Sequence, residues 1–152
     1  MRERSKKRVG EILIEDGVLT QENLDEALIQ QKKEGGIIGQ ILIRLGYVTE
    51  ENLIAALSKQ LGIPYLPLPN YSVNMETIRE YGYDFCKQNM LIAFDQDDKY
   101  IYVSTADPLN DIALEHIENQ SKRRAQVFIS TPSEIVNMLD LAFAASSDNG
   151  KN

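Results

Sequence analysis

Apolar residues in the first 64 positions recur with a helical period, and the same pattern is written twice. In residues 24–31, leucine, alanine, leucine and glutamine fall at i, i+3, i+4 and i+7, which predicts one face of an amphipathic helix. The segment Arg8–Gln31 aligns with Ile37–Gln60 at an offset of 29 residues, and 12 of the 24 aligned positions are identical. Two copies are too few for a solenoid, so we expect two helix–turn–helix units that pack together with approximate two-fold symmetry.

Small residues mark the turn inside each repeat. Gly17 and Gly46 occupy the position just past a helix end, where a positive φ is least costly without a β-carbon. Thr20 and Thr49 follow as N-cap residues, because their hydroxyls can accept a hydrogen bond from an amide of the next helical turn. The short segment before each glycine is too brief to decide between helix and strand by its own pattern. Taken with the repeat, it predicts a four-helix unit that ends at a Gly-Ile-Pro sequence.

The rest of the chain predicts a mixture of short strands and helices. The sequence YLPLPN at Tyr65–Asn70 excludes a helix interior and predicts an extended connector, where we place a domain boundary. Thr131-Pro132-Ser133-Glu134 is a strong helix start, with a cap, a proline at the first helical position and a glutamate after them. We predict strands at 90–94, 100–105 and 126–130, and helices at 75–81, 83–88, 110–120 and 132–143. This order predicts a crossover onto a short sheet and an α+β fold class overall.

These patterns predict two domains with a tail at each end. Residues 8–64 form a tandem-repeat helical domain, and residues 65–143 form a small α+β domain with about three strands. Residues 1–7 and 144–152 are expected to be flexible tails. The net charge of −7 predicts repulsion from nucleic acid and from anionic lipid, apart from the basic cluster at the start of the chain. No apolar run approaches the ~20 residues of a membrane span, and a lone cysteine, Cys86, suits a reducing cytoplasm.

Six leucines of the repeats are expected to form the contact between them. Each lies on the apolar face of its predicted helix: Leu13, Leu24, Leu28, Leu42, Leu53 and Leu57. Replacing Leu28 or Leu57 by alanine is then expected to leave a cavity and to lower the free energy of unfolding by about 2–5 kcal/mol.

The doubled motif resembles a known family. In each copy, an apolar residue and a glycine precede a leucine, a second glycine, two further leucines and a glutamine at fixed spacing; the first copy begins with an arginine. This pattern is similar to the MshEN-type domain, the N-terminal domain of type II secretion and type IV pilus assembly ATPases. That family includes receptors for cyclic di-GMP. Gly62-Ile63-Pro64, Ala106-Asp107-Pro108 and Thr131-Pro132 resemble its second part, so the resemblance extends from about Arg8 to Phe143.

The resemblance implies that cyclic di-GMP contacts the motif positions of both copies and one aspartate of the second part. These residues are Arg8, Val9, Gly10, Leu13, Gly17, Leu24, Leu28, Gln31, Ile38, Gly39, Leu42, Gly46, Leu53, Leu57, Gln60 and Asp107.

The chemistry of these residue types is compatible with a cyclic dinucleotide. Cyclic di-GMP carries two guanines and two phosphates related by a two-fold axis, which suits two equivalent half-sites. The Arg8 guanidinium can bond O6 and N7 of a guanine, and the Asp107 carboxylate can accept from its N1–H and N2–H. Leucine side chains can pack on base faces, amides at the helix starts can approach phosphate oxygens, and the glutamines can both donate and accept.

The same residues can instead have purely structural roles. The helix-start glycines also permit close helix packing, the glutamines also suit helix ends, and Asp107 before a proline suits a helix entry. The second copy departs from the family pattern, because Ile37 stands where a basic residue is common. Either the second half-site is weakened or Arg44 substitutes for the missing charge. Val9 and Ile38 replace a usual leucine, which is a milder change.

The sequence offers little for catalysis. It contains no phosphate-binding loop of the G-x-x-x-x-G-K-[ST] type, and one histidine and one cysteine cannot build a metal cluster or a nucleophile–base pair. We therefore expect no enzyme activity, no cofactor and no metal. Two functions remain. One is a cyclic di-GMP-binding regulatory domain of a bacterial type II secretion or type IV pilus ATPase system. The other is a ligand-free docking module that joins the ATPase to its inner-membrane platform protein. Acidic helix faces argue against nucleic acid as a partner.

Overall fold

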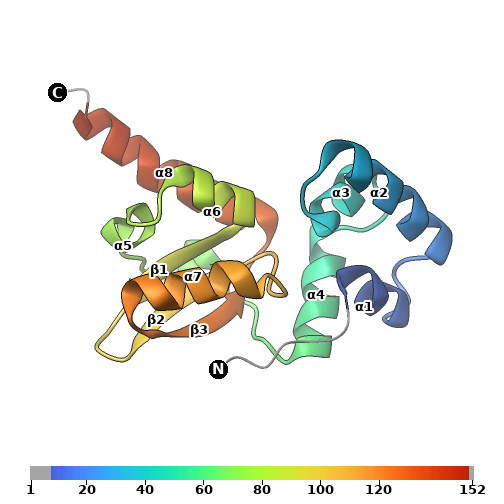
Figure 1. The fold of residues 1–152 in the computed structure, drawn as a ribbon, viewed down its shortest axis with the longest axis horizontal. Coiled ribbons are helices and arrows are strands. Elements are labelled where there is room, and N and C mark those ends of the chain that lie inside the picture. The colour runs from blue at the N-terminus through green and yellow to red at the C-terminus, as the bar shows by residue number, and fades with distance from the viewer. Residues whose placement is uncertain (1–7, 151–152) are drawn as a thin grey trace. The chain divides into compact units, whose positions relative to one another are not determined.

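Four helices built from the two repeats form the N-terminal part of the structure. The computed structural model describes residues 8–150, with side chains as far as Ala144. The chain divides into two units, Met1–Pro64 and Tyr65–Asn152. Within the described residues the first unit contains α1 (Val9–Glu15), α2 (Gln21–Glu34), α3 (Ile38–Arg44) and α4 (Glu50–Leu61), which are the blue to green helices of Figure 1. The short segment before each turn glycine is therefore a helix.

The caps and turns of the repeats lie where the sequence predicts them. The hydroxyl of Thr20 accepts a hydrogen bond from the amide three residues ahead at 3.2 Å, and Thr49 does the same at 3.0 Å. Gly17 and Gly46 adopt φ values of +79° and +82°, which only glycine adopts without strain. Both N-cap predictions and both turn predictions are confirmed. The two repeats thus use the same local chemistry to reverse the chain.

Each short helix lies against the long helix of the other repeat. The α1 helix contacts α4, the α3 helix contacts α2, and the two short helices contact each other. Such reciprocal contacts are what two related helix pairs packed face to face produce, so the predicted contact between the repeats is confirmed. Five of the six leucines expected at this contact are buried: Leu13, Leu24, Leu42, Leu53 and Leu57.

Leu28 does not belong to this core. Its side chain is 42% exposed, whereas its counterpart in the second repeat, Leu57, is 0% exposed. The expectation that both leucines are core residues is therefore wrong for Leu28. A helical period shows which way a side chain points, but not how far the neighbouring elements extend over it. Leu28 lies beside the exposed Ile29 on α2, at the margin of the apolar face.

The second unit is built around a three-stranded mixed sheet of order β1-β2-β3. The strands β1 (Leu91–Gln96) and β2 (Tyr100–Thr105) form an antiparallel hairpin, and β3 (Arg124–Ile129) lies parallel to β2. The helix α7 (Asp111–Ser121) makes the crossover between the two parallel strands and packs against β3 (Figure 1). The predicted crossover onto a short sheet is confirmed, and so is the α+β fold class.

Three further helices and one 3-10 turn complete the second unit. They are η1 (Leu68–Asn70), α5 (Met75–Arg79), α6 (Tyr83–Asn89) and α8 (Pro132–Gly150). The helices α5, α6 and α8 contact β1, and α8 also packs against α5 and α6. The start of α8 carries the predicted reciprocal cap. The Glu134 amide donates to the Thr131 hydroxyl at 3.1 Å, and the Thr131 amide donates to the Glu134 carboxylate at 3.0 Å.

The only cysteine of the sequence is a core residue, as predicted. The Cys86 side chain on α6 is 0% exposed, and burial raises the pKa of its thiol to about 12. Because a nucleophilic cysteine must be a thiolate, this thiol is unreactive near neutral pH.

Two boundaries differ from those predicted. The last helix continues to Gly150 instead of ending at about Phe143, because its small residues are compatible with a helix and no proline interrupts them. The connector after Pro64 is not extended throughout, since the 3-10 turn η1 lies within it. Residues 1–7, 151 and 152, which were predicted to be tail residues, lie outside the described part of the chain.

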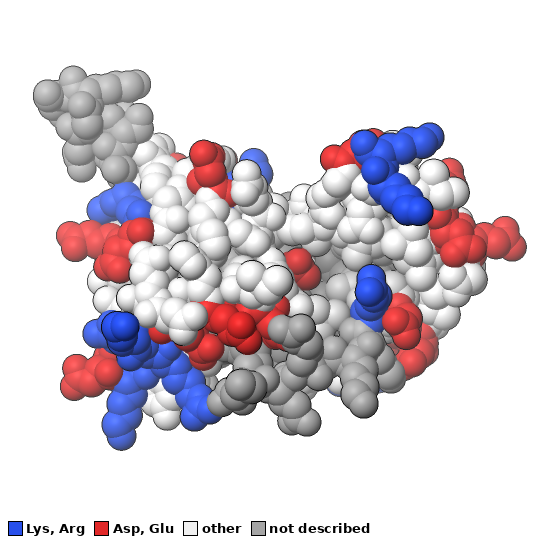
Figure 2. Space-filling view, viewed as in Figure 1, with Lys and Arg blue, Asp and Glu red and all other residues white. Residues whose placement is uncertain are grey.

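Charged side chains are spread over both units. Figure 2 shows Lys and Arg gathered at the corner of the second unit where the β1–β2 turn and the α7–β3 turn lie. Lys99 and Lys122 are exposed in those turns, and Arg124 is exposed at the first residue of β3. Within residues 8–150, no helix combines the length and the apolar character that crossing a membrane requires.

The different burial of Leu28 and Leu57 predicts different costs for the same substitution. We expect Leu57→Ala to lower the free energy of unfolding by about 2–5 kcal/mol, because it empties a fully buried site. Leu28→Ala should lower it by less than about 1 kcal/mol, because its side chain is already partly solvated. Urea unfolding of the two variants measures both values. Equal costs would contradict the burial described here.

Candidate functional site

Arg8 and Ile37 occupy the same position in the two repeats. Each is the N-cap of its short helix, with an extended backbone of φ −93° and ψ 161° at Arg8 and φ −91° and ψ 127° at Ile37. Arg8 is exposed, and its guanidinium forms no ion pair with the residues that the structure describes. Ile37 is half-buried and carries no charge. The repeats therefore present an arginine and an isoleucine from equivalent backbone positions.

The residues that follow Arg8 are packed closely against α2. Val9 and Gly10 are buried, and a β-carbon added to Gly10 would lie 2.5 Å from Cδ1 of Leu24. In the second repeat Gly39 is buried and Ile38 is half-buried, and the matching distance from Gly39 to Cδ2 of Leu53 is 3.3 Å. These glycines allow each short helix to approach the leucine of its own repeat. This geometry favours the packing role that the sequence left open.

Two other glycines of the motif are needed for their backbone conformation. Gly17 and Gly46 are exposed, and a β-carbon added to either would have no atom within 4 Å. Their positive φ values therefore explain why glycine is needed there.

The two motif glutamines differ in their hydrogen bonds. Gln31 donates from Nε2 to the carbonyl of Gly36 at 2.9 Å, which fixes the end of α2 and leaves its carbonyl oxygen as an acceptor. Gln60 is exposed, and no hydrogen bond joins its side chain to the described residues. Gln31 is thus already oriented, whereas Gln60 is not.

Among the described residues, two ion pairs join the repeats. The Lys59 ammonium on α4 lies 3.0 Å from the Asp16 carboxylate at the end of α1, and the Arg44 guanidinium lies 2.8 Å from the Glu34 carboxylate. Arg44 is in the last turn of α3, about 10 Å along the axis from the N-cap at Ile37. It is also engaged with Glu34. The alternative that Arg44 replaces a basic side chain at position 37 would therefore require Arg44 to leave Glu34.

Asp107 lies in the second unit, in the turn between β2 and α7. Its amide donates to the Thr105 hydroxyl at 2.9 Å, and its carbonyl accepts from the Asn110 amide at 3.1 Å. Among the described residues no group donates a hydrogen bond to its carboxylate. Burial raises the pKa of this carboxyl from 3.8 to about 6. Asp107 is therefore a partly buried, unpaired acceptor, which is an unusual and costly state for a carboxylate.

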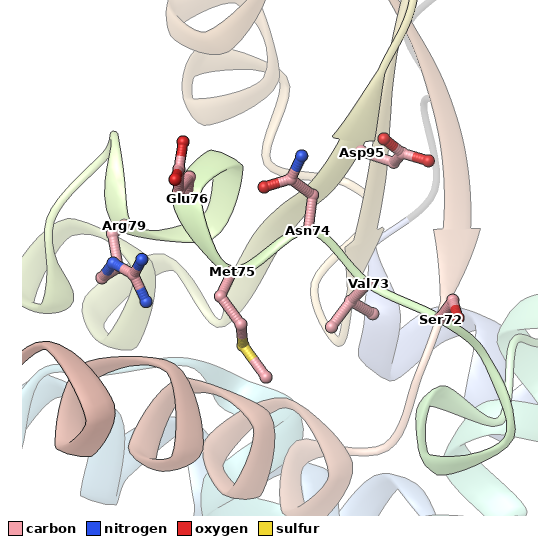
Figure 3. Close-up of a pocket in the computed structure, with 7 residues that line it drawn as sticks. All are labelled: Ser72, Val73, Asn74, Met75, Glu76, Arg79 and Asp95. Atoms are coloured by element: carbon pink, nitrogen blue, oxygen red, sulfur yellow. The ribbon is translucent and has the colours of Figure 1, made fainter.

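A hollow of about 570 Å³ also lies in the second unit, and none of the residues expected from the sequence lines it. The segment before α5, α5 itself and the end of β1 line it, with these residues: Ser72, Val73, Asn74, Met75, Glu76, Arg79 and Asp95. Figure 3 shows Asn74 and Glu76 pointing to one side of the segment, and Val73 and Met75 to the other. Asn74 caps α5, and Arg79 donates to the carbonyl of Ala142 at 3.2 Å. Two of its polar side chains therefore already have structural partners.

Comparison with known proteins gives one family match and one relative. A profile of the MshEN domain matches residues 61–148. The type IV pilus assembly ATPase PilB of Myxococcus xanthus (strain DK1622) is 23% identical over 111 residues, which are 73% of this chain and 20% of PilB. The chain therefore spans about a fifth of the length of this relative.

Two similar solved structures extend the likeness to the repeats. A structure of MshE with cyclic di-GMP is 25% identical, has a TM-score of 0.69, and aligns over 90% of this chain and 99% of the MshE chain. The N-terminal domain of XpsE is 23% identical with a TM-score of 0.70, over 92% of this chain and 97% of that domain. The XpsE likeness shows the fold.

A β-carbon would lie closer to its neighbouring leucine at Gly10 than at Gly39, so we expect alanine to be tolerated less well at Gly10. Gly10→Ala should lower the free energy of unfolding by roughly 1–3 kcal/mol, because the buried Leu24 must move. Gly39→Ala should be near neutral, because the smaller overlap is offset by a gain in helix propensity of about 1 kcal/mol. Thermal or urea unfolding of this matched pair gives the comparison. A Gly39→Ala variant that is the less stable of the two would contradict the distances given above.

The burial of Asp107 predicts that this residue costs stability near neutral pH. Its pKa is raised in the folded chain, so the folded state favours the protonated acid. The contribution to stability is complete below the unfolded pKa of 3.8 and is lost as the pH rises through about 6. Asp107→Asn should therefore stabilise the protein by roughly 1–2 kcal/mol at pH 7 and by much less at pH 4. Urea unfolding at both pH values tests this, and a destabilised variant at pH 7 would refute it.

Proposed function

Because the chain belongs to the MshEN domain family, we propose that it is a cyclic di-GMP-binding regulatory domain of a bacterial type II secretion or type IV pilus ATPase system. The observation that carries the proposal is the likeness to MshE with cyclic di-GMP, which aligns over nearly the whole of both chains. The relative PilB is a type IV pilus assembly ATPase. The chain spans about a fifth of PilB, and we assign to it a regulatory role in such a system.

Arg8 supplies the contact that recognises guanine. Its exposed guanidinium, at the start of α1 and without an ion-pair partner in the described residues, is available for a ligand. A planar guanidinium can donate two parallel hydrogen bonds to O6 and N7 of guanine, and adenine offers a donor in place of O6. Arg8 therefore gives the site a preference for guanine over adenine.

The first repeat also supplies apolar and polar surface beside this arginine. The exposed side chain of Leu28 can pack on the face of a base, and the oriented Gln31 retains its carbonyl oxygen as an acceptor. The buried motif leucines support this surface from below.

Asp107 supplies an acceptor for the Watson–Crick edge of guanine. Its carboxylate is partly buried and lacks a donor among the described residues, so a base that offers N1–H and N2–H would satisfy it. The cost of holding this carboxylate unpaired in the free protein is then recovered on binding. Below about pH 6 the acid is protonated and cannot accept both bonds, so binding weakens as the pH falls.

A docking module for an inner-membrane platform protein is the second candidate function. Leu28 and the 57%-exposed Ile29 are neighbours on α2 and form an apolar surface that a protein partner can cover equally well. The two functions differ in whether the chain binds a nucleotide on its own. Binding of cyclic di-GMP by the isolated chain favours regulation.

Calorimetric titration with cyclic di-GMP tests the proposal. The wild-type chain should bind it, and Arg8→Ala should weaken binding roughly tenfold or more, because a bidentate contact to guanine is worth about 1–3 kcal/mol. Arg124→Ala, which removes another exposed arginine from the second unit, is the matched control and should change affinity little. Cyclic di-AMP should bind weakly to all three proteins. If the wild-type chain binds neither dinucleotide at high micromolar concentration, the docking function becomes the better account.

A further inference from the structure

The two repeats hold equivalent backbone positions but do not offer equivalent chemistry. The N-caps of α1 and α3 share an extended conformation, yet one carries the exposed guanidinium of Arg8 and the other the half-buried side chain of Ile37. A hydrocarbon side chain cannot donate to O6 or N7 of a base. Of the two repeats, only the first therefore presents a guanine-reading group at this position.

The two repeats also differ in how much of the equivalent leucine side chain is exposed. Leu28 in the first repeat is 42% exposed, whereas Leu57 in the second is 0% exposed. The residue after Leu57, Ser58, donates its hydroxyl to the carbonyl of Ile63 at 2.7 Å, whereas the residue after Leu28 is the exposed Ile29. An exposed leucine that a base can cover is therefore present at this position in the first repeat and absent in the second.

The cations of the second repeat are already engaged elsewhere. Arg44 pairs with Glu34 at the far end of α3, and Lys59 pairs with Asp16 at 3.0 Å. Within residues 37–60 these are the two basic side chains. In the free chain both cations are therefore paired with carboxylates of the first repeat.

We propose that the tandem repeat reads only one of the two bases as guanine, so that it accepts a mixed cyclic dinucleotide with one guanine and one adenine. This inference rests on the proposed function and specifies its ligand class. The guanine is read by Arg8 in the first repeat. The second base meets a surface without a hydrogen-bonding cation, and it is held through its flat face, which adenine and guanine share.

Ligand symmetry sets the size of the expected difference. Cyclic di-GMP can place either guanine against Arg8, whereas the mixed dinucleotide has one productive orientation. The mixed dinucleotide should therefore bind only about twofold more weakly, a small difference on the scale of binding free energies. Cyclic di-AMP offers Arg8 no guanine in either orientation, so it should bind about tenfold more weakly or worse.

Titration of the wild-type chain with these three cyclic dinucleotides tests the inference. Affinities for cyclic di-GMP and the mixed dinucleotide that agree within about threefold, with cyclic di-AMP clearly weaker, would support it. A preference of tenfold or more for cyclic di-GMP over the mixed dinucleotide would overturn it and leave the proposed function standing. Absence of binding to all three would overturn the proposed function and this inference together.

Two variants and a control sharpen the test. Arg8→Ala should weaken the binding of cyclic di-GMP and of the mixed dinucleotide roughly tenfold or more, and should leave the affinity for cyclic di-AMP nearly unchanged. Ile37→Arg restores a guanidinium at the equivalent N-cap and should create a preference of about tenfold for cyclic di-GMP over the mixed dinucleotide. Arg124→Ala should leave all three affinities unchanged. An Ile37→Arg variant that folds normally but gains no preference would contradict the assignment of position 37 to the second base.

Discussion

The first unit depends on the packing of each short helix against the partner repeat. Helices of seven residues are too short to be stable alone in water, so α1 and α3 exist because tertiary contacts hold them. Gly10 and Gly39 let these helices approach the leucines of their own repeats. The reciprocal contacts of α1 with α4 and of α3 with α2 bury the other apolar side chains of the short helices. The position of Arg8 follows from this packing, because Arg8 is the residue at which α1 begins.

A repeated scaffold has allowed the two copies to carry different side chains. The caps, the turn glycines and most of the buried leucines are the same in both, since they are needed for the helix–turn–helix geometry itself. The copies differ in residue type at Arg8 against Ile37, and they differ in burial at a shared leucine, which is exposed at Leu28 and buried at Leu57. Structural symmetry is therefore retained while chemical symmetry is lost. We infer that ligand recognition in this chain is concentrated in the first repeat.

Much of the fold was predictable because local chemistry determines it. Threonine caps, glycine turns and the reciprocal cap at Thr131 and Glu134 are interactions between residues close in sequence. The exposure of Leu28 was not predictable, since it depends on which elements extend over α2. The engagement of Arg44 with Glu34 was also missed, because the two residues belong to different helices. Likewise, the sequence placed Asp107 before a proline, but only the fold shows that its carboxylate is partly buried without a donor.

The central claim is that cyclic di-GMP binds to the tandem repeat, chiefly through its first copy. The most direct measurement is a titration of isotope-labelled protein followed by two-dimensional amide NMR spectra. The account predicts that the largest shifts within the repeats fall on the amides around Arg8 and on the exposed face of α2 near Leu28 and Gln31. Smaller shifts are expected around Ile37. Saturable shifts that are confined to the hollow before α5, or that are larger around Ile37 than around Arg8, would contradict it.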